Sequence, residues 1–450
     1  MQIKKGSKRY LVAKVFIIFF IFFSCILLAY TFHRAEITFS GTRAYVYNKY
    51  YIFSVASLIF WIFILKLKDE IILNTVLFSL SILASLYLAE AILNKVLSPE
   101  YSDDYDTRTV YEVYTDLINN GYEAIPSVRP SIFLSSNGLP LKDKDELLPL
   151  SGVSNIKTVY CNESGKRIIY QSDKYGFRNT SSSWDKTSNL WVLIGDSFTQ
   201  GACVEDEHTF ASYIDNLEEE VSVISLGMGG NGPLIELASI EEYAKDLKPE
   251  KVFWLYFEGN DLANLPEELN SPILRKYLNR EFNQNLKNRQ EEIDSRINEF
   301  VKESKDQRES RSTFQLETFV QNSRTLRLLY IRRFLGIDQK GNDADFTSDF
   351  KKVIEEAKIR IKQWNGELIF VYLPEYSRYL LDEPGSLSFR QRGEVLSIIE
   401  GLEIEVIDIH EQVFDKHPDP LSLFPRRTEA HYTPEGYNLS SKVITEAKEK

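Results

Sequence analysis

The chain has 450 residues and a formal net charge of -12, from 65 acidic and 53 basic side chains. A chain of this length can bury more than one hydrophobic core and is expected to form more than one domain. The acidic balance argues against nucleic acid as a partner, because binding to phosphates needs clustered lysines and arginines. Three cysteines are too few for a disulfide scaffold or a cysteine-rich metal site.

Residues 1–95 are expected to form a membrane anchor of three helices. Apolar runs long enough to cross a bilayer lie at about 11–31, 47–65 and 71–93. The alternative, buried helices of a soluble protein, is disfavoured by three such runs in succession. The first run is also too long for a signal-peptide core and lacks a clear cleavage site. The lipid bilayer is therefore an expected partner.

Basic residues predict how the anchor is oriented. Four basic residues precede the first run and one lies near its start, with no acidic residue among them: Lys4, Lys5, Lys8, Arg9 and Lys14. The amino terminus is therefore expected in the cytoplasm, and three crossings place the chain after about residue 95 outside. Basic residues in the loop 33–49 are the feature that opposes this orientation.

Two of the cysteines, Cys161 and Cys203, lie in the part expected outside the membrane, while Cys25 lies in the first apolar run. An extracytoplasmic compartment would permit a disulfide between the first two. Whether they pair stays open at this point, because the separation of their Cα atoms decides it.

From residue 185 the chain alternates between short apolar runs and helical segments. Strands are expected at 189–194, 221–226, 251–257, 367–373 and 404–409, and helices at 208–217, 234–247, 350–364, 389–399 and 434–448. This alternation predicts an α/β fold with a doubly wound parallel sheet. Residues 96–184 are expected to be a polar connector with lead-in strands at 156–161 and 168–171.

A helical insertion is expected at about 262–345, between the third strand and the helix at 350. Its length of about 80 residues exceeds an ordinary connection. The charge-rich stretch 267–311 favours a solvated helical hairpin on the domain surface. The alternative is a cap that leans over the active site and selects the substrate.

Four short motifs fall at the ends of expected strands or at the start of an expected helix. They are Gly195-Asp196-Ser197, the glycine-rich stretch 225–231 with Gly230, Gly259-Asn260-Asp261, and His431. Parallel strands bring their carboxyl ends to one edge of a sheet, where open α/β folds place their sites. Each motif alone could be an ordinary turn or helix cap. Together, in this order, they indicate one site.

These four motifs resemble the four blocks of the SGNH (GDSL-type) hydrolase family, over roughly residues 185–450. The lead-in Gly176-Phe177-Arg178 is similar to that of membrane-anchored bacterial members. The resemblance implies Ser197 as the nucleophile and His431 as the base. It also implies an oxyanion hole built from the N–H groups of Ser197 and Gly230 and the side-chain amide of Asn260. Asp196, Gly259 and Asp261 are expected to support these loops, and neither a metal nor a cofactor is expected.

The sequence departs from the family at the acid that orients the histidine. Many members carry an aspartate two or three residues before it, whereas this chain has Thr428 three residues before His431. Glu429, two residues before, is the candidate acid. A backbone carbonyl could also orient the imidazole.

The resemblance implies a bacterial inner-membrane protein with a periplasmic or otherwise extracytoplasmic serine esterase or O-acyltransferase domain. Its expected substrates are acyl esters, above all acetyl esters, of a cell-surface or exported polysaccharide. Acyl transfer would further require a membrane acyltransferase partner, because three spans are too few to carry an acyl donor across the membrane. The alternative is a non-catalytic, membrane-tethered carbohydrate-binding or assembly protein on a degenerate SGNH fold, which the missing aspartate favours.

Overall fold

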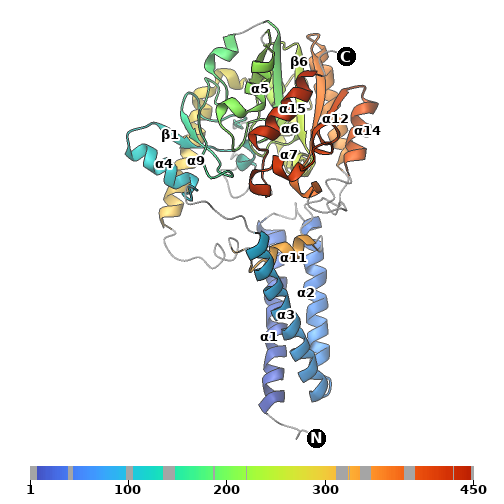
Figure 1. Ribbon diagram of the computed structural model, residues 1–450. Helices are drawn as coiled ribbons and strands as arrows, with labels where there is room; N and C mark the ends of the chain where they lie inside the picture. The colour runs from blue at the N-terminus through green and yellow to red at the C-terminus, as the bar shows by residue number, and fades with distance from the viewer. Residues whose placement is uncertain are drawn as a thin grey trace. The chain divides into compact units, whose positions relative to one another are not determined.

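The structure is a computed structural model (Figure 1). It describes residues 8–38, 44–97, 105–134, 147–185, 188–218, 220–310, 323, 325–334, 346–379, 391–428 and 430–446. The chain divides into two compact units, Met1–Ser98 with Thr313–Ala344, and Pro99–Ser312 with Asp345–Lys450. The expected insertion at 262–345 therefore contributes to both units.

The first unit contains the three helices expected to form the anchor, α1 (Lys8–Phe32), α2 (Ala44–Leu65) and α3 (Asp69–Leu97). All three are long and apolar enough to cross a membrane. Large apolar side chains such as Phe22 and Phe78 are exposed on them, as lipid-facing side chains would be. Their orientation across a bilayer stays a prediction.

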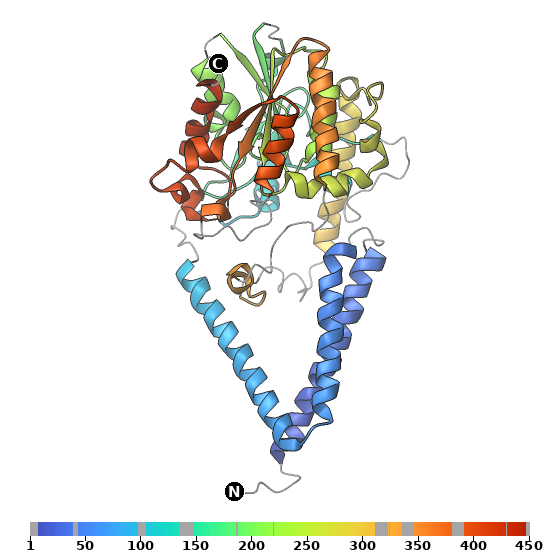
Figure 2. The same cartoon turned by 90° about the vertical axis from the view of Figure 1, so that its right-hand side faces the viewer.

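Side chains join these helices to one another within the unit. Helices α1 and α2 run side by side (Figure 2), with the rings of Phe20 and Trp61 stacked 4.5 Å apart. Glu90 of α3 is fully buried and accepts hydrogen bonds of 2.9 Å from the N–H groups of Tyr330 and Ile331 in α11 (Leu329–Phe334). A buried carboxylate needs such donors, and this contact joins the last part of the insertion to the anchor.

The second unit is built on a five-stranded parallel sheet in the order β5-β4-β6-β7-β8. The strands are β4 (Leu190–Gly195), β5 (Ser222–Ser225), β6 (Lys251–Phe257), β7 (Glu367–Leu373) and β8 (Glu405–Asp408). All pairs are parallel. The expected strands and the α/β fold class are thus confirmed, with strand ends that differ by one residue at β4, β5 and β8.

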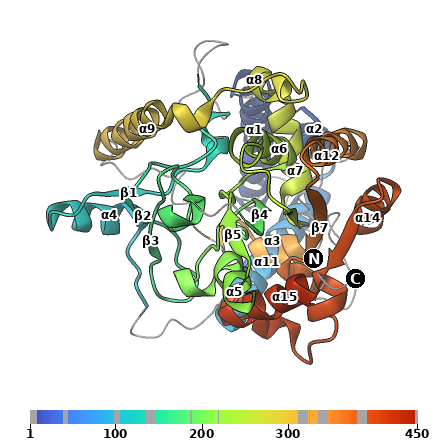
Figure 3. The ribbon, with the colours of Figure 1, turned by 90° about the horizontal axis from the view of Figure 1, so that it is seen from above.

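Helices cover both faces of this sheet (Figure 3). One face carries α6 (Pro233–Ser239), α12 (Thr347–Lys362) and α14 (Arg392–Gly401), and the other carries α5 (Phe210–Leu217) and α15 (Pro434–Glu446). Side chains of β4 alternate between the two cores, with Val192 in the first and Leu193 in the second. This alternation follows from the two-residue period of a strand.

The connector forms α4 (Val110–Asn119) and a second, three-stranded sheet. Strand β2 (Lys157–Val159) pairs in parallel with β1 (Ala124–Pro126) and antiparallel with β3 (Ile169–Gln171). Strands β2 and β3 lie within the expected lead-in strands. Strand β1 was not expected, because its sequence Ala124-Ile125-Pro126 has a single β-branched residue and ends in proline.

The first part of the insertion forms α7 (Asp261–Asn270), α8 (Pro272–Lys276) and α9 (Gln290–Ser310). Helix α9 is rich in charge, yet it buries Ile293, Ile297 and Val301 in the core of the sheet domain. These residues share one helical face, since they are spaced four apart. The charged stretch is therefore amphipathic and packed on the domain rather than wholly solvated.

A buried ion pair in the second unit gives a stability prediction. Arg360 of α12 is 1% exposed and donates from Nη1 to Glu241 Oε2 at 2.6 Å. We expect Arg360→Met to lower the free energy of unfolding by about 2 kcal/mol, because the Glu241 carboxylate stays buried and, among the described residues, keeps only its pair with Lys245. Thermal unfolding of the full chain in detergent, followed by circular dichroism, measures the change.

The matched control removes an arginine that bonds the same helix at the surface. Arg280 makes two hydrogen bonds of 2.7 and 2.8 Å to Glu356 of α12, and its side chain is 47% exposed. Arg280→Met should cost about 1 kcal/mol or less, because solvent screens exposed pairs. Equal losses in both variants would contradict the assignment of Arg360 to a stabilising buried pair.

Candidate active site

Ser197 lies on a tight loop directly after β4. The Asp196 side chain is fully buried and accepts a 2.9 Å hydrogen bond from the N–H of Phe198. The N–H of Ala202 in turn donates to the carbonyl of Ser197 at 2.9 Å. Asp196 therefore fixes the backbone of the turn that follows it.

Residues 197–203, which follow β4, form turns, and the helix expected at 208–217 begins only at Phe210. Gly201 and Cys203 have φ values of +75° and +61°, a left-handed backbone that ends any helix. The first α-helix after the serine is α5, and a single 3-10 turn at Asp206–His208 precedes it. The serine loop is thus held by hydrogen bonds from the Asp196 side chain and within its own backbone rather than by a helix.

His431 lies just before α15, and its Nε2 atom is 2.8 Å from Ser197 Oγ. The next residue, Tyr432, is fully buried and donates from its hydroxyl to the carbonyl of Pro374 at 2.7 Å. Its ring also contacts that of Phe198, with centroids 4.7 Å apart. The histidine loop and the serine loop, 234 residues apart in sequence, therefore pack on each other.

Glu163 provides a carboxylate that the sequence analysis did not identify. Its Oε1 lies 2.9 Å from His431 Nδ1, and its Oε2 accepts from the His431 backbone N–H at 2.8 Å. It belongs to the connector between β2 and β3, outside the range that resembles the hydrolase family. Glu429, the expected acid, lies outside the described residues. Thr428 donates its hydroxyl to the carbonyl of Pro425 at 3.1 Å.

These contacts define how the imidazole is protonated. An ionised carboxylate only accepts hydrogen bonds, so Nδ1 of His431 carries the proton and Nε2 of the neutral ring can accept from Ser197. Burial by itself lowers the pKa of His431, but the charge and hydrogen bond of Glu163 outweigh it and raise this pKa above its ordinary value. A more basic imidazole is a stronger general base.

The glycine loop carries one candidate oxyanion donor, the backbone N–H of Gly230. Gly230 has a φ of +73°, which favours glycine, and a Cβ there would lie 3.2 Å from atoms of Arg129 and Ser131. Glu268 of α7 anchors the loop by accepting from the N–H groups of Gly232 at 2.6 Å and Leu234 at 2.8 Å. Within the described chain, the N–H groups of Ser197 and Gly230 donate to no acceptor.

Asn260 follows β6, with its side-chain amide facing carboxyl groups. With the amide oriented so that donors face acceptors, its nitrogen lies 3.2 Å from both Asp196 Oδ2 and Asp261 Oδ1, and its oxygen accepts from Asn264 at 3.3 Å. Asp261 accepts from the N–H of Phe257 at 2.7 Å, and a Cβ at Gly259 would collide with the same Phe257 ring. Asp261 and Gly259 therefore shape the loop that carries Asn260. The oxyanion role of Asn260 stays a prediction.

Negative charge beside a developing oxyanion would oppose ester chemistry. Burial raises the pKa of Asp261 well above its ordinary value, and the nearby Glu236 raises it further. Burial also raises the pKa of Asp196, although a hydrogen bond from the N–H of Phe198 opposes this. Burial therefore favours the neutral form of the Asp261 carboxyl, which limits the negative charge near the oxyanion.

The oxyanion assignment gives a kinetic prediction. We expect Asn260→Ala to lower kcat for ester hydrolysis by about 100-fold, with a much smaller change in KM, because the donor acts mainly in the transition state. Steady-state kinetics with p-nitrophenyl acetate measure both constants. Asn288→Ala, in an exposed turn, is the control. A loss confined to KM would contradict an oxyanion role.

The structure also answers the question left open for the cysteines. Cys161 and Cys203 form a disulfide, with Cα atoms 5.2 Å apart. Donor atoms of Glu163, Cys203 and His431 lie within 4.8 Å of one another, a spacing that could suit a metal ion. Because the sulfur of Cys203 is bonded to Cys161, this group offers no thiolate ligand, and we assign no metal to it.

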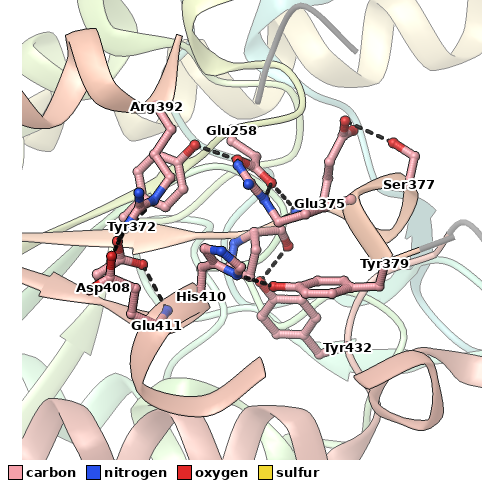
Figure 4. A network of polar contacts seen from close by, with 12 residues as sticks. Glu258, Tyr372, Glu375, Ser377, Tyr379, Arg392, Asp408, His410, Glu411 and Tyr432 are labelled. Atoms are coloured by element: carbon pink, nitrogen blue, oxygen red, sulfur yellow. Dashed lines mark hydrogen bonds and ion pairs between the residues drawn. The ribbon is translucent and has the colours of Figure 1, made fainter. Parts of the chain in front are cut away.

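A polar network lies at the carboxyl ends of β6, β7 and β8 (Figure 4). Glu258, next to the end of β6, is buried and accepts from Arg378 Nε at 2.9 Å and from the hydroxyl of Tyr372. The network also contains the pair Tyr379–His410 and the group Arg392, Asp408 and Glu411. Tyr432, the residue after His431, contacts the edge of this network by donating its hydroxyl to the carbonyl of Pro374. The network therefore supports the loop that carries His431.

No protein-family model and no curated protein matches the chain. Several solved structures are similar in fold over part of it. A lipase/acylhydrolase from Enterococcus faecalis is 15% identical, with a TM-score of 0.34 over 58% of this chain and 94% of its own. A member of the lipolytic protein G-D-S-L family from Veillonella parvula is 15% identical, with a TM-score of 0.33 over 58% and 98%. The acetyl xylan esterase AlAXEase is 12% identical, with a TM-score of 0.33 over 57% and 98%.

Proposed function

We propose that the chain is a membrane-anchored serine esterase or O-acyltransferase of the SGNH type. Ser197 is the nucleophile, His431 the general base and Glu163 the acid that orients it. One observation carries the proposal: Ser197 Oγ, the two ring nitrogens of His431 and Glu163 Oε1 form a continuous line of contacts of 2.8 and 2.9 Å. This is the arrangement that a serine needs for activation.

The reaction starts when Ser197 Oγ attacks the acyl carbonyl and passes its proton to His431 Nε2. Negative charge develops on the carbonyl oxygen, where the N–H groups of Ser197 and Gly230 and the amide of Asn260 would donate to it. The imidazolium then protonates the leaving alkoxide, and an acyl-enzyme remains on Ser197. Water releases the acid in an esterase, whereas a sugar hydroxyl accepts the acyl group in a transferase.

The proposed substrates are O-acyl groups, in the first place acetyl, on a cell-surface or exported polysaccharide. This choice follows from the resemblance of the motifs to membrane-anchored SGNH members. The proposed compartment is extracytoplasmic, since a disulfide persists in an oxidising environment. A transferase would further need a membrane acyltransferase partner that supplies the acyl donor.

Acetate release tests this function. The full chain, purified in mild detergent, is incubated with O-acetylated xylan and, separately, with p-nitrophenyl acetate. Acetate release that is lost in Ser197→Ala is expected, and acetyl groups that appear on an added oligosaccharide would indicate transfer. If a folded wild-type chain releases no more acetate than Ser197→Ala, the alternative of a non-catalytic carbohydrate-binding protein is preferred.

A further inference from the structure

The disulfide joins the two segments that meet at the proposed active site. Cys161 lies two residues before Glu163, and Cys203 lies six residues after Ser197. A disulfide fixes the separation of the two chains that it links. It therefore ties the connector that carries the acid to the loop that carries the nucleophile.

The disulfide also lies close to the Glu163–His431 pair. The sulfur of Cys203, a carboxylate oxygen of Glu163 and a ring nitrogen of His431 lie within 4.8 Å of one another. Cys203 is 3% exposed and has a left-handed backbone, with a φ of +61°. A buried residue held in a conformation that costs energy is fixed by its surroundings, so it is a rigid anchor for Cys161.

Glu163, by contrast, lies in a surface turn. The turn closes between Cys161 and Ile168, whose N–H donates to the Cys161 carbonyl at 2.9 Å. At its tip the N–H of Gly165 donates to Asn162 Oδ1 at 2.8 Å. Surface turns of this kind open locally more readily than the core. The disulfide fixes the turn two residues before the acid.

We propose that the Cys161–Cys203 disulfide is a positioning crosslink that holds Glu163 on His431, so that the triad is complete only in chains in which this bond has formed. The inference rests on the proposed function. Formation of the bond takes two electrons and two protons from the thiols, and a disulfide-bonded oxidoreductase of the extracytoplasmic compartment accepts them as it becomes a dithiol. The esterase would thus stay poorly active until it leaves the reducing cytoplasm.

A double-mutant cycle tests the crosslink on the full chain in detergent. The double variant Cys161→Ser/Cys203→Ser, Glu163→Gln and the triple variant are compared with wild type in hydrolysis of p-nitrophenyl acetate. We expect the double variant to lose at least tenfold in kcat with KM changed less than twofold. Glu163→Gln should then cost far less in that background than in wild type, because the acid is already displaced. Cys25→Ser, in α1, is the control and should keep wild-type kcat.

Two further readouts separate positioning from general instability. The rising limb of the pH profile of kcat/KM should move to lower pH in the double variant, as in Glu163→Gln, while circular dichroism stays native. If the double variant does not fold, the same comparison is made on wild type reduced by a water-soluble phosphine, with thiol formation followed by intact mass. An equal cost of Glu163→Gln in both backgrounds overturns the inference alone. A wild-type chain with no esterase activity overturns the proposed function instead.

Discussion

Replacing Ser197 by alanine is expected to lower kcat for ester hydrolysis by at least about 10⁴-fold, because the reaction then has no nucleophile to form an acyl-enzyme. The loss should be in kcat rather than KM, since the side chain is small and binds the substrate weakly. Stopped assays with p-nitrophenyl acetate on the full chain in detergent measure both constants. Substitution of His431 by alanine should cost a similar factor, and the double variant should be hardly worse than either single one.

A serine away from the site gives the matched control. Ser181→Ala changes an exposed residue outside the serine and histidine loops and should leave kcat and KM at their wild-type values. Residual activity above about one tenth in a folded Ser197→Ala chain cannot come from the proposed nucleophile. Such a result would place the hydrolysis at another group or make it a background reaction.

Substitution of Glu163 by glutamine should lower kcat by about 10³- to 10⁴-fold, because the neutral amide no longer stabilises the imidazolium or fixes its tautomer. The pH profile should change as well. A general base acts when it is neutral, so kcat/KM rises with pH through the pKa of His431. Glu163 raises this pKa against the effect of burial, and its loss should therefore move the rising limb to lower pH.

Glu429→Gln is the comparison that decides between the two acids. If Glu163 is the acid, this variant should keep kcat within a factor of about two to three and should keep the wild-type pH profile. A large loss in Glu429→Gln, together with wild-type kinetics in Glu163→Gln, would restore the acid expected from the sequence. Losses in kcat of similar size in Glu429→Gln and Glu163→Gln would mean that neither carboxylate alone orients His431.

The sheet domain could be predicted closely because its strands are buried on both faces. Continuous apolar runs such as Trp191–Ile194 and Val252–Phe257 are typical of parallel strands between two helical layers, and their order along the chain implied crossover helices. Strand β1 could not be predicted, since Ala124 and Pro126 are poor strand formers and its extended shape depends on pairing with β2. The apolar stripe of α9 was hidden by the many charges around it.

The site was predictable to the extent that it lies at strand ends. Ser197 and Asn260 each follow a strand of the sheet, so one edge collects them, and Gly230 enters from the loop after β5. Glu163 could not be found in this way. It comes from a separate small sheet, and its approach to His431 depends on tertiary packing rather than on any local pattern. The one signal near it was Cys161, whose partner is a residue of the serine loop.

Labelling with a fluorophosphonate tests the central claim most directly, because the probe reacts with a serine only when a neighbouring base activates it. The full chain in mild detergent is treated with the probe and weighed intact. The proposed triad predicts one adduct per wild-type chain, none in Ser197→Ala and much slower labelling in Glu163→Gln. A folded wild-type chain that takes up no probe, or a Ser197→Ala chain labelled as fast as wild type, would contradict it.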